Sequence, residues 1–157
     1  RESWGIYTSA ENISNSVLNK TTDREKLNFL LTSRGYTCPS FYIADQFNKY
    51  NRSVWVYSFD RVRDSIKSKE MGAYHGAELP YIFNTHDVWL PTSKIDIQLT
   101  DSIQNYWINF IKSNNPNNKM REKWPEHIYG SYKALSFNNA IKYSQNPSKN
   151  ICKILNF

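Results

Sequence analysis

The histidine best placed for chemistry lies in the stretch from Gly72 to Phe83, which reads Gly-Ala-Tyr-His-Gly-Ala-Glu-Leu-Pro-Tyr-Ile-Phe. A general base must reach the proton of a nucleophile, so it needs a fixed and accessible loop. Gly72 and Gly76 bracket His75, and glycine adopts backbone angles that tight turns require. Pro80 disfavours helical geometry at the residue before it. On these residues alone, an ordinary histidine in a surface turn is a commoner interpretation than a catalytic base.

Five further segments accompany this stretch. They are residues 36–40 (YTCPS), 54–60 (VWVYSFD), 99–117 (with YWINF and NPN), 124–125 (WP) and 135–137 (LSF). Together with the residues around His75, they occur in the order of the type-B carboxylesterases, the cholinesterase-like branch of the α/β-hydrolases, which the chain therefore resembles. In residues 1 to about 22 we identify no motif of that family. The resemblance implies an α/β fold in which residues 1–157 are the C-terminal part of one esterase-type domain, with 1–22 an unassigned lead-in.

The resemblance also implies roles for two side chains. His75 would be the catalytic histidine of a Ser-Glu/Asp-His triad, and Glu78 would lie beside its loop and bond the loop and active-site waters. An acid that merely starts a helix is the alternative for Glu78. In α/β-hydrolases the triad runs serine, acid, histidine along the chain, and the serine sits in a Gly-x-Ser-x-Gly elbow.

None of the five glycines pairs with another to bracket a serine at the spacing of that elbow. We therefore expect the serine, the triad acid and the oxyanion donors to belong to an N-terminal portion that this sequence does not contain. The expected function is hydrolysis of a small-molecule carboxylic ester through an acyl-enzyme, with this fragment inactive alone. No cofactor and no metal site is expected.

Two other function classes stay open. The family contains members that lost the serine, so a non-catalytic protein for adhesion, storage or crystal formation is one alternative. The asparagine- and lysine-rich composition resembles the esterase-like and crystal-forming proteins of slime moulds, which favours this alternative, whereas the presence of His75 argues mildly against it. An unrelated binding domain is the other alternative.

The two cysteines and three sequons bear on the compartment. In the cholinesterase-like family a disulfide joins the cysteine-proline segment to a cysteine near the end of the catalytic domain, which implies a Cys38–Cys152 bond here. Two free thiols of a cytosolic protein are the alternative. Glycosylation sequons begin at Asn12, Asn19 and Asn51, and such motifs are common in asparagine-rich chains. We expect a secreted or vesicular protein.

The formal net charge of +6 does not indicate nucleic-acid binding, because lysines and arginines alternate with acids along the chain. The sequence contains no run of about 18 apolar residues, so it predicts no membrane-spanning helix. The expected partners are the N-terminal portion of the same esterase and the ester substrate. The family often dimerises, so a homodimer is also open.

Periodicity and turn residues predict alternating helices and strands. The predicted helices are 23–33, capped by Thr22 and followed by Gly35, then 40–48, 101–112 and 151–155. Strands are expected at 53–59 and 133–137, and a polar loop at 60–74. Leu27, Leu30 and Leu31 should share one helix face, and Ile103, Trp107, Phe110 and Ile111 another, with Trp107 and Phe110 in the core. His86 and His127 are expected at the surface, and Asp60 in a structural role.

Overall fold

The computed structural model describes residues 13, 15, 20, 22–86, 91–118 and 122–157 of the 157-residue chain. These residues fall into two compact units. Unit 1 takes its described residues from Arg1–Val56, Glu126–Lys133 and Gln145–Phe157, and unit 2 from Tyr57–Pro125 and Ala134–Ser144. The sequons at Asn12 and Asn19 lie outside the described residues.

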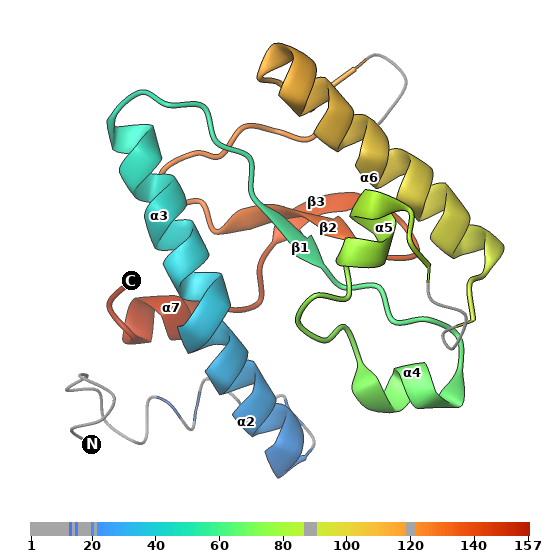
Figure 1. Ribbon diagram of the computed structural model, residues 1–157. Helices are drawn as coiled ribbons and strands as arrows, with labels where there is room; N and C mark the ends of the chain where they lie inside the picture. Colours follow the sequence, from blue (N-terminus) through green and yellow to red (C-terminus); the bar gives the residue numbers. More distant parts are fainter. Residues whose placement is uncertain (1–12, 14, 16–19, 21, 87–90, 119–121) are drawn as a thin grey trace. The chain divides into compact units, whose positions relative to one another are not determined.

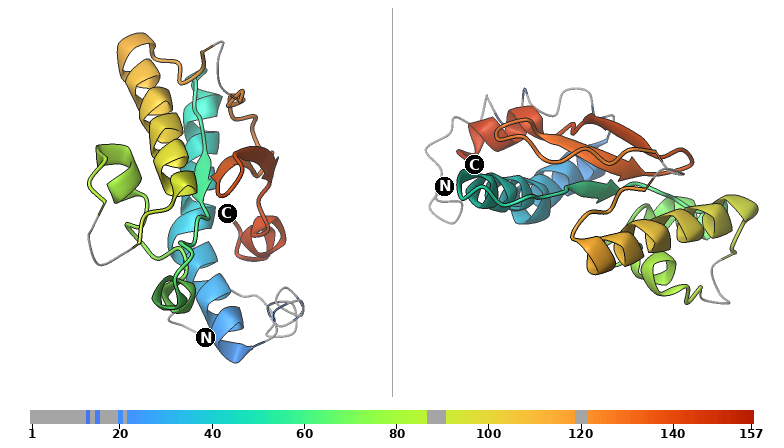
Figure 2. Two further views of the ribbon diagram at one scale, coloured as in Figure 1. Left: turned by 90° about the vertical axis from the view of Figure 1, so that its right-hand side faces the viewer. Right: turned by 90° about the horizontal axis from the view of Figure 1, so that it is seen from above.

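Unit 1 is built on one long helical segment. Helix α2 (Asp23–Thr32) continues through the π-helix η2 (Ser33–Thr37) into α3 (Cys38–Lys49), as Figures 1 and 2 show. The predicted cap is present, because the Thr22 hydroxyl accepts from the Glu25 amide and the Glu25 carboxylate accepts from the Thr22 amide. Gly35 does not end the helix as predicted. It lies inside η2, where the chain makes a wider turn and continues.

The core of unit 1 lies where α3 meets the C-terminal helix α7 (Lys149–Ile154). Cys38 of α3 and Cys152 of α7 form the disulfide that the resemblance implied, across a sequence separation of 114 residues. A buried hydrogen bond of 2.9 Å between the hydroxyls of Ser33 and Ser148 lies in the same unit. The buried apolar side chains are Phe41, Ala44, Tyr132, Ile151 and Leu155. A disulfide and a buried hydrogen bond therefore join the long helical segment to the last residues of the described chain.

Unit 2 contains most of a three-stranded sheet with the order β1-β2-β3. Strand β1 (Tyr57–Phe59) pairs in parallel with β2 (Lys133–Phe137), with Ser58 opposite Ser136. Strand β1 is shorter than the predicted 53–59, and β3 (Lys142–Gln145) was not predicted. Phe137 of β2 is fully buried among aromatic rings, which supply the apolar contacts that hold the sheet to the helices.

Helix α6 (Lys94–Ser113) is the longest element of unit 2 and begins seven residues before the predicted start. Its buried apolar residues are Leu99, Ile103 and Tyr106, whereas Phe110 is 46% exposed. The buried face of α6 therefore differs from the predicted one. The helix buries the side that carries Asp96, Leu99, Ile103 and Tyr106.

The predicted polar loop 60–74 contains a helix, α4 (Ile66–Met71). The next helix, α5 (Leu79–Phe83), lies alongside α6 in every view. Asn84 and Asn114 end α5 and α6 in the left-handed conformation, which asparagine tolerates better than most residues.

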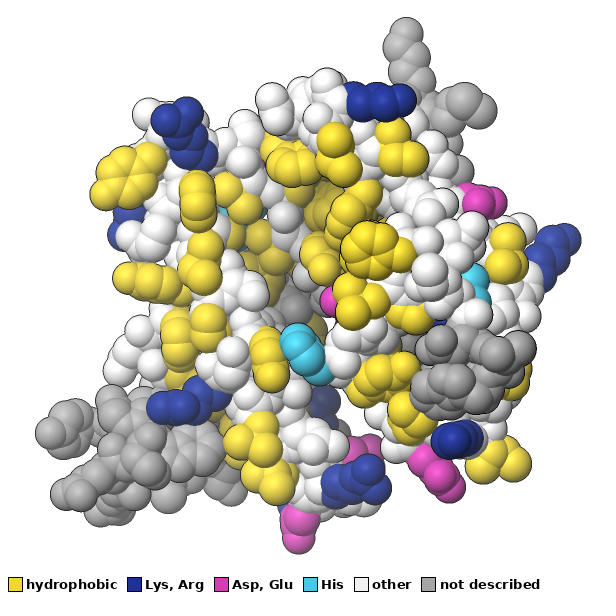
Figure 3. Space-filling model, viewed as in Figure 1, with side chains coloured by type: hydrophobic (Ala, Val, Ile, Leu, Met, Phe, Trp, Pro, Cys, Tyr) yellow, Lys and Arg dark blue, Asp and Glu magenta, His cyan; other side chains and the backbone are white. Residues whose placement is uncertain are grey.

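Both units leave large apolar side chains exposed. On the α2–α3 segment, Leu27, Leu31, Ile43 and Phe47 are about half exposed or more, so the predicted leucine face of α2 is not buried in the described chain. Hydrophobic side chains are visible over α3 and over the α5–α6 region in Figure 3. Contiguous exposed apolar surface commonly marks a contact with another segment or protein.

The disulfide gives a direct test of unit 1. In the protein that contains this chain, alkylation should modify Cys38 and Cys152 only after a reductant is added, because neither is a free thiol. Replacing both cysteines by serine should lower the free energy of unfolding by roughly 4 kcal/mol, measured by urea denaturation, because the unfolded chain loses a long cross-link. Alkylation of either cysteine in the folded, unreduced protein would contradict the pairing.

Candidate active site

His75 lies in a tight turn between α4 and α5, which we call the histidine turn (residues 72–78). Gly72 ends α4 with a φ of 68°, and its amide donates to the Ser68 carbonyl at 2.9 Å. Gly76 has a φ of 88°, another angle that favours glycine. The His75 side chain is exposed. The two glycines thus allow a reversal that presents the imidazole at the surface of unit 2.

Glu78 is half-buried at the end of the histidine turn, directly before α5. Its backbone carbonyl accepts from the amides of Tyr81 and Ile82 at 2.9 and 3.1 Å, which starts the helix. Burial raises the pKa of the Tyr57 hydroxyl, and the negative charge of Glu78 raises it further.

A buried ion pair lies beneath the histidine turn. The Arg61 Nε donates to the Asp96 Oδ1 at 2.8 Å, with side chains that are 1% and 0% exposed. The Tyr81 hydroxyl donates to the same carboxylate at 2.7 Å, and the Ser93 amide donates to its Oδ2 at 2.8 Å. We call Arg61, Asp64, Tyr81, Ser93 and Asp96 the ion-pair cluster.

The cluster satisfies the hydrogen-bonding groups of its two buried charges. Arg61 reaches the more exposed Asp64 at 2.7 Å and the Asn139 side-chain oxygen at 2.8 Å, so each of its nitrogens has an acceptor. Burial alone raises the pKa of Asp96, but the hydrogen bonds from Arg61, Ser93 and Tyr81 outweigh it and hold that pKa well below the usual range. Burial and the Asp96 carboxylate together raise the pKa of Tyr81. Asp96 is therefore a carboxylate and Tyr81 a phenol at neutral pH.

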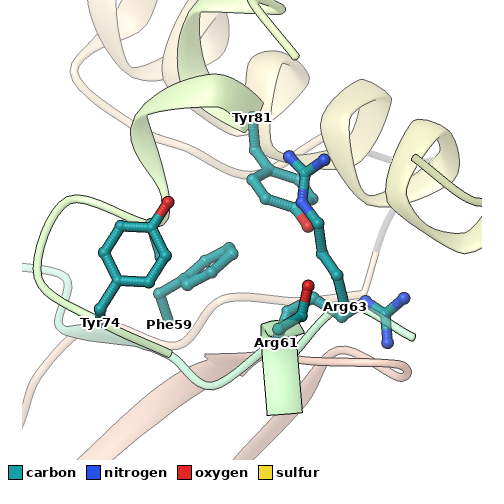
Figure 4. Close-up of a pocket in the computed structure, with 7 residues that line it drawn as sticks. Phe59, Arg61, Arg63, Tyr74 and Tyr81 are labelled. Carbon is teal, nitrogen blue, oxygen red and sulfur yellow. The ribbon is translucent and has the colours of Figure 1, made fainter. Parts of the chain in front are cut away.

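Figure 4 shows how this region is arranged around a small pocket. Tyr81 lies between Phe59, with ring centroids 4.9 Å apart, and the Arg63 guanidinium, 5.2 Å from the Tyr81 ring centroid. Tyr74, the neighbour of His75, lines the same pocket. The free volume of about 20 Å³ fits a water molecule and is too small for an ester. The residues around this pocket thus form a packed support beside the histidine turn.

His86 is half-buried and was wrongly expected at the surface. Its Nδ1 lies 2.9 Å from the Arg63 Nη2, and its Nε2 lies 2.8 Å from the Thr100 hydroxyl. Arginine only donates, so Nδ1 accepts and the ring carries its proton on Nε2. The Thr100 hydroxyl in turn donates to the Asp96 carbonyl at 2.8 Å. Hydrogen bonds to Arg63, in the chain between β1 and α4, and to Thr100 of α6 therefore hold His86 in its half-buried position.

His127 belongs to unit 1 and was also wrongly expected at the surface. It is 3% exposed, and its Nε2 lies 2.7 Å from the Asp45 carboxylate of α3. The Gly130 amide donates to the same oxygen at 2.9 Å. Asp45 gives the buried imidazole a polar partner, so the role of His127 is to hold residues 126–130 to α3. Asp60 has a structural role as expected, accepting from the hydroxyls of Ser58 and Ser136.

In the part of the chain that the structure describes, no three histidine, cysteine, aspartate or glutamate side chains gather as metal ligands. Within the same residues, every helix is too short or too polar to cross a membrane.

The chain matches a known protein family in sequence and solved structures in fold. Residues 6–155 match the family described as "Carboxylesterase family". Three curated relatives are Neuroligin-3 of Mus musculus (33% identical over 107 residues), Acetylcholinesterase of Bungarus fasciatus (28% over 116) and Crystal protein of Dictyostelium discoideum (31% over 99). These alignments cover 63%, 69% and 59% of this chain and 13%, 19% and 18% of the respective relatives.

Solved esterases share the fold. A structure titled "PNB ESTERASE" matches with a TM-score of 0.74 and 21% identity over 95% of this chain and 31% of that one. The Geobacillus stearothermophilus carboxylesterase EST55 matches with a TM-score of 0.74 and 18% identity, over 92% and 32%. The chain therefore has part of the α/β-hydrolase fold. It spans about a fifth or less of the curated relatives and about a third of these structures.

The ion-pair cluster predicts an acid-sensitive unit 2. The Asp96 carboxyl has a lower pKa in the folded protein than in the unfolded chain, so its stabilisation is complete above a pH of about 5. Below that pH the unfolded chain binds the proton first, and the stabilisation is lost as the pH falls towards the folded-state pKa. We expect Asp96→Asn to lower the free energy of unfolding by roughly 3 kcal/mol at pH 7.

The same substitution should flatten the loss of stability between about pH 5 and pH 2, because an amide does not titrate in that range. Urea denaturation across this pH range measures both effects. Asp101→Asn is the matched control, since Asp101 is exposed on the same helix and should leave the acid profile of the wild type unchanged. Parallel acid profiles for Asp96→Asn and the wild type would refute the assignment.

Proposed function

This chain belongs to the carboxylesterase family, and we propose that it supplies the catalytic histidine of a carboxylic-ester hydrolase. His75 is the proposed general base. The nucleophilic serine, the acid of the triad and the oxyanion donors come from residues outside this sequence, because the sequence contains no Gly-x-Ser-x-Gly elbow. The whole active site is thus proposed to form only in the complete protein.

In the proposed reaction His75 moves one proton in each half. It accepts the proton of the serine hydroxyl as the serine oxygen bonds to the ester carbonyl carbon. It then gives that proton to the alcohol oxygen as the ester C–O bond breaks, which leaves an acyl-enzyme. Water attacks the acyl carbon, His75 takes the proton of the water, and the proton returns to the departing serine oxygen. No cofactor is required by these steps.

The exposure of His75 on a turn that two glycines allow is the observation that carries the proposal. A base must present its imidazole to a group on another segment, and this side chain is accessible for that contact. Glu78 lies three residues further on, half-buried directly before α5, where we propose that it bonds the turn and active-site waters.

Two features support a place within a larger domain. Strand β1 has a neighbour, β2, on one edge only among the described strands, so its other edge offers backbone groups for a further strand. The exposed apolar side chains of α3, such as Ile43 and Phe47, offer surface that further chain can bury. Both are expected of a C-terminal part that packs on an N-terminal one.

A non-catalytic function is the second candidate. The relatives named Neuroligin-3 and Crystal protein, whose names state no hydrolytic activity, favour it at 33% and 31% identity. The complete sequence discriminates the candidates, because an esterase requires a serine elbow and an upstream acid, and a protein without them cannot form an acyl-enzyme.

We further propose that the protein matures in the secretory pathway. The Cys38–Cys152 disulfide supports this, since such bonds persist in oxidising compartments. Asn51 begins the sequon that falls within the described residues, and residues 51–53 are all exposed in the turn after α3. This site can accept a glycan without unfolding α3.

His75→Ala in the full-length protein should lower the rate of p-nitrophenyl acetate hydrolysis by about 100-fold or more, because the serine loses its base. Covalent labelling by a fluorophosphonate should slow in parallel. The control is Lys69→Ala, an exposed substitution in the neighbouring helix α4, which should leave both rates unchanged. Labelling that is equally fast without the imidazole would refute the role given to His75.

The Asn51 sequon is tested by expression of the full-length protein in a eukaryotic secretory host. Enzymatic deglycosylation in heavy-oxygen water should leave a labelled aspartate at position 51, detected by peptide mass spectrometry. Ser53→Ala should abolish the label and Ser53→Thr should retain it, because only the latter keeps the acceptor motif. An unlabelled Asn51 in the secreted protein would contradict the proposal.

A further inference from the structure

The histidine turn and α5 form one hydrogen-bonded body. The Ala77 amide donates to the Tyr74 carbonyl at 3.0 Å, and the Leu79 amide donates to the Gly76 carbonyl at 3.1 Å. The Ile82 amide then donates to the Glu78 carbonyl at 3.1 Å. These bonds run without a break from the residue before His75 into the helix. The position of His75 is therefore set by the position of α5.

Helix α5 has five residues, which is too short for a helix to be stable by itself in water. Its placement must come from contacts with other elements. Two side-chain hydrogen bonds join it to α6: the Tyr81 hydroxyl donates to the Asp96 carboxylate at 2.7 Å, and the Gln104 amide donates to the Ile82 carbonyl at 3.2 Å. The first is the shorter and ends on a charge, so it is the stronger of the two.

Tyr81 is held at both ends of its side chain. The ring is 1% exposed and packs against Phe59, whereas the hydroxyl reaches the ion-pair cluster (Figure 4). The carboxylate that receives the hydroxyl is itself fixed, because Arg61 and the Ser93 amide hold its two oxygens. A rotation or shift of α5 would break this contact and leave a buried phenol without its acceptor.

We propose that Tyr81 is a positioning residue for His75, whose hydroxyl bond to the buried Asp96 carboxylate fixes α5 and with it the histidine turn. This inference rests on the proposed role of His75 as the base. A base displaced by about 1 Å can lose roughly 100-fold in rate, so an anchor six residues along the chain has a measurable effect on the chemical step. Tyr81 does not touch the reacting atoms.

Tyr81→Phe tests the inference, because it removes one oxygen and retains the ring that packs on Phe59. In the full-length protein we expect kcat for p-nitrophenyl acetate to fall about 10-fold or more while KM stays unchanged, since the serine and the ester site are elsewhere. Tyr106→Phe is the matched control. Tyr106 is also 1% exposed, and its hydroxyl donates to the Glu122 carbonyl and not to the ion-pair cluster.

Tyr106→Phe should lower stability without lowering kcat, which separates positioning from a general loss of stability. Amide hydrogen exchange of the peptide covering residues 72–83 provides a readout that does not depend on activity. Exchange should become faster in Tyr81→Phe and stay as in the wild type in Tyr106→Phe, because only the first loses the anchor of α5.

The outcomes separate this inference from the proposed function. Full activity in His75→Ala refutes the role of His75, and the exchange data still decide whether Tyr81 fixes the turn. Inactive His75→Ala with equal kcat values for Tyr81→Phe and Tyr106→Phe overturns the positioning role alone. Unchanged exchange over residues 72–83 in Tyr81→Phe overturns the anchor itself.

Discussion

Arg61 and Asp96 constrain the whole of unit 2 because both are buried and both are charged. A buried charge without partners is strongly destabilising, so the segments that carry the partners must come together before either side chain can leave water. Arg61 and Asp64 lie in the chain after β1, Asp96 lies at the start of α6, and Asn139 follows β2. The pair therefore adds little net stability by itself, but it excludes arrangements in which one of these segments is elsewhere.

The surroundings of His75 show how this constraint reaches a functional group. Helices α4 and α5 are six and five residues long, so neither can hold the histidine turn by its own backbone bonds. The buried Tyr81 after the turn connects it to α6, and the buried Ser68 before it accepts from the Gly72 amide through its carbonyl. A mobile surface turn would hold its imidazole in many directions, and a general base needs one. The turn is exposed, yet its two ends are fixed by buried contacts.

Local signals in the sequence predicted what is local in the structure. Thr22 predicted the start of α2, strand 133–137 was confirmed, and 151–155 differs from α7 by one or two residues. The start of α6 was also encoded, since Ser93 and Asp96 form a capping box, but Asp96 resembles an ordinary capping acid until Arg61 is placed beside it. Nothing local links residues 35 positions apart. His86 and His127 were misjudged for the same reason, because their partners Thr100 and Asp45 are distant in sequence.

The two units are closed by different chemistry. Each assembles segments far apart along the chain, and bringing such segments together costs conformational entropy. In unit 1 the Cys38–Cys152 bond offsets this cost by restricting the unfolded chain. Unit 2 contains neither cysteine and depends instead on Arg61, which reaches acceptors 35 and 78 residues away. Reduction therefore acts first on unit 1 and acid on unit 2. Because His75 belongs to unit 2, the geometry of the proposed base depends on the ionisation of a buried carboxylate.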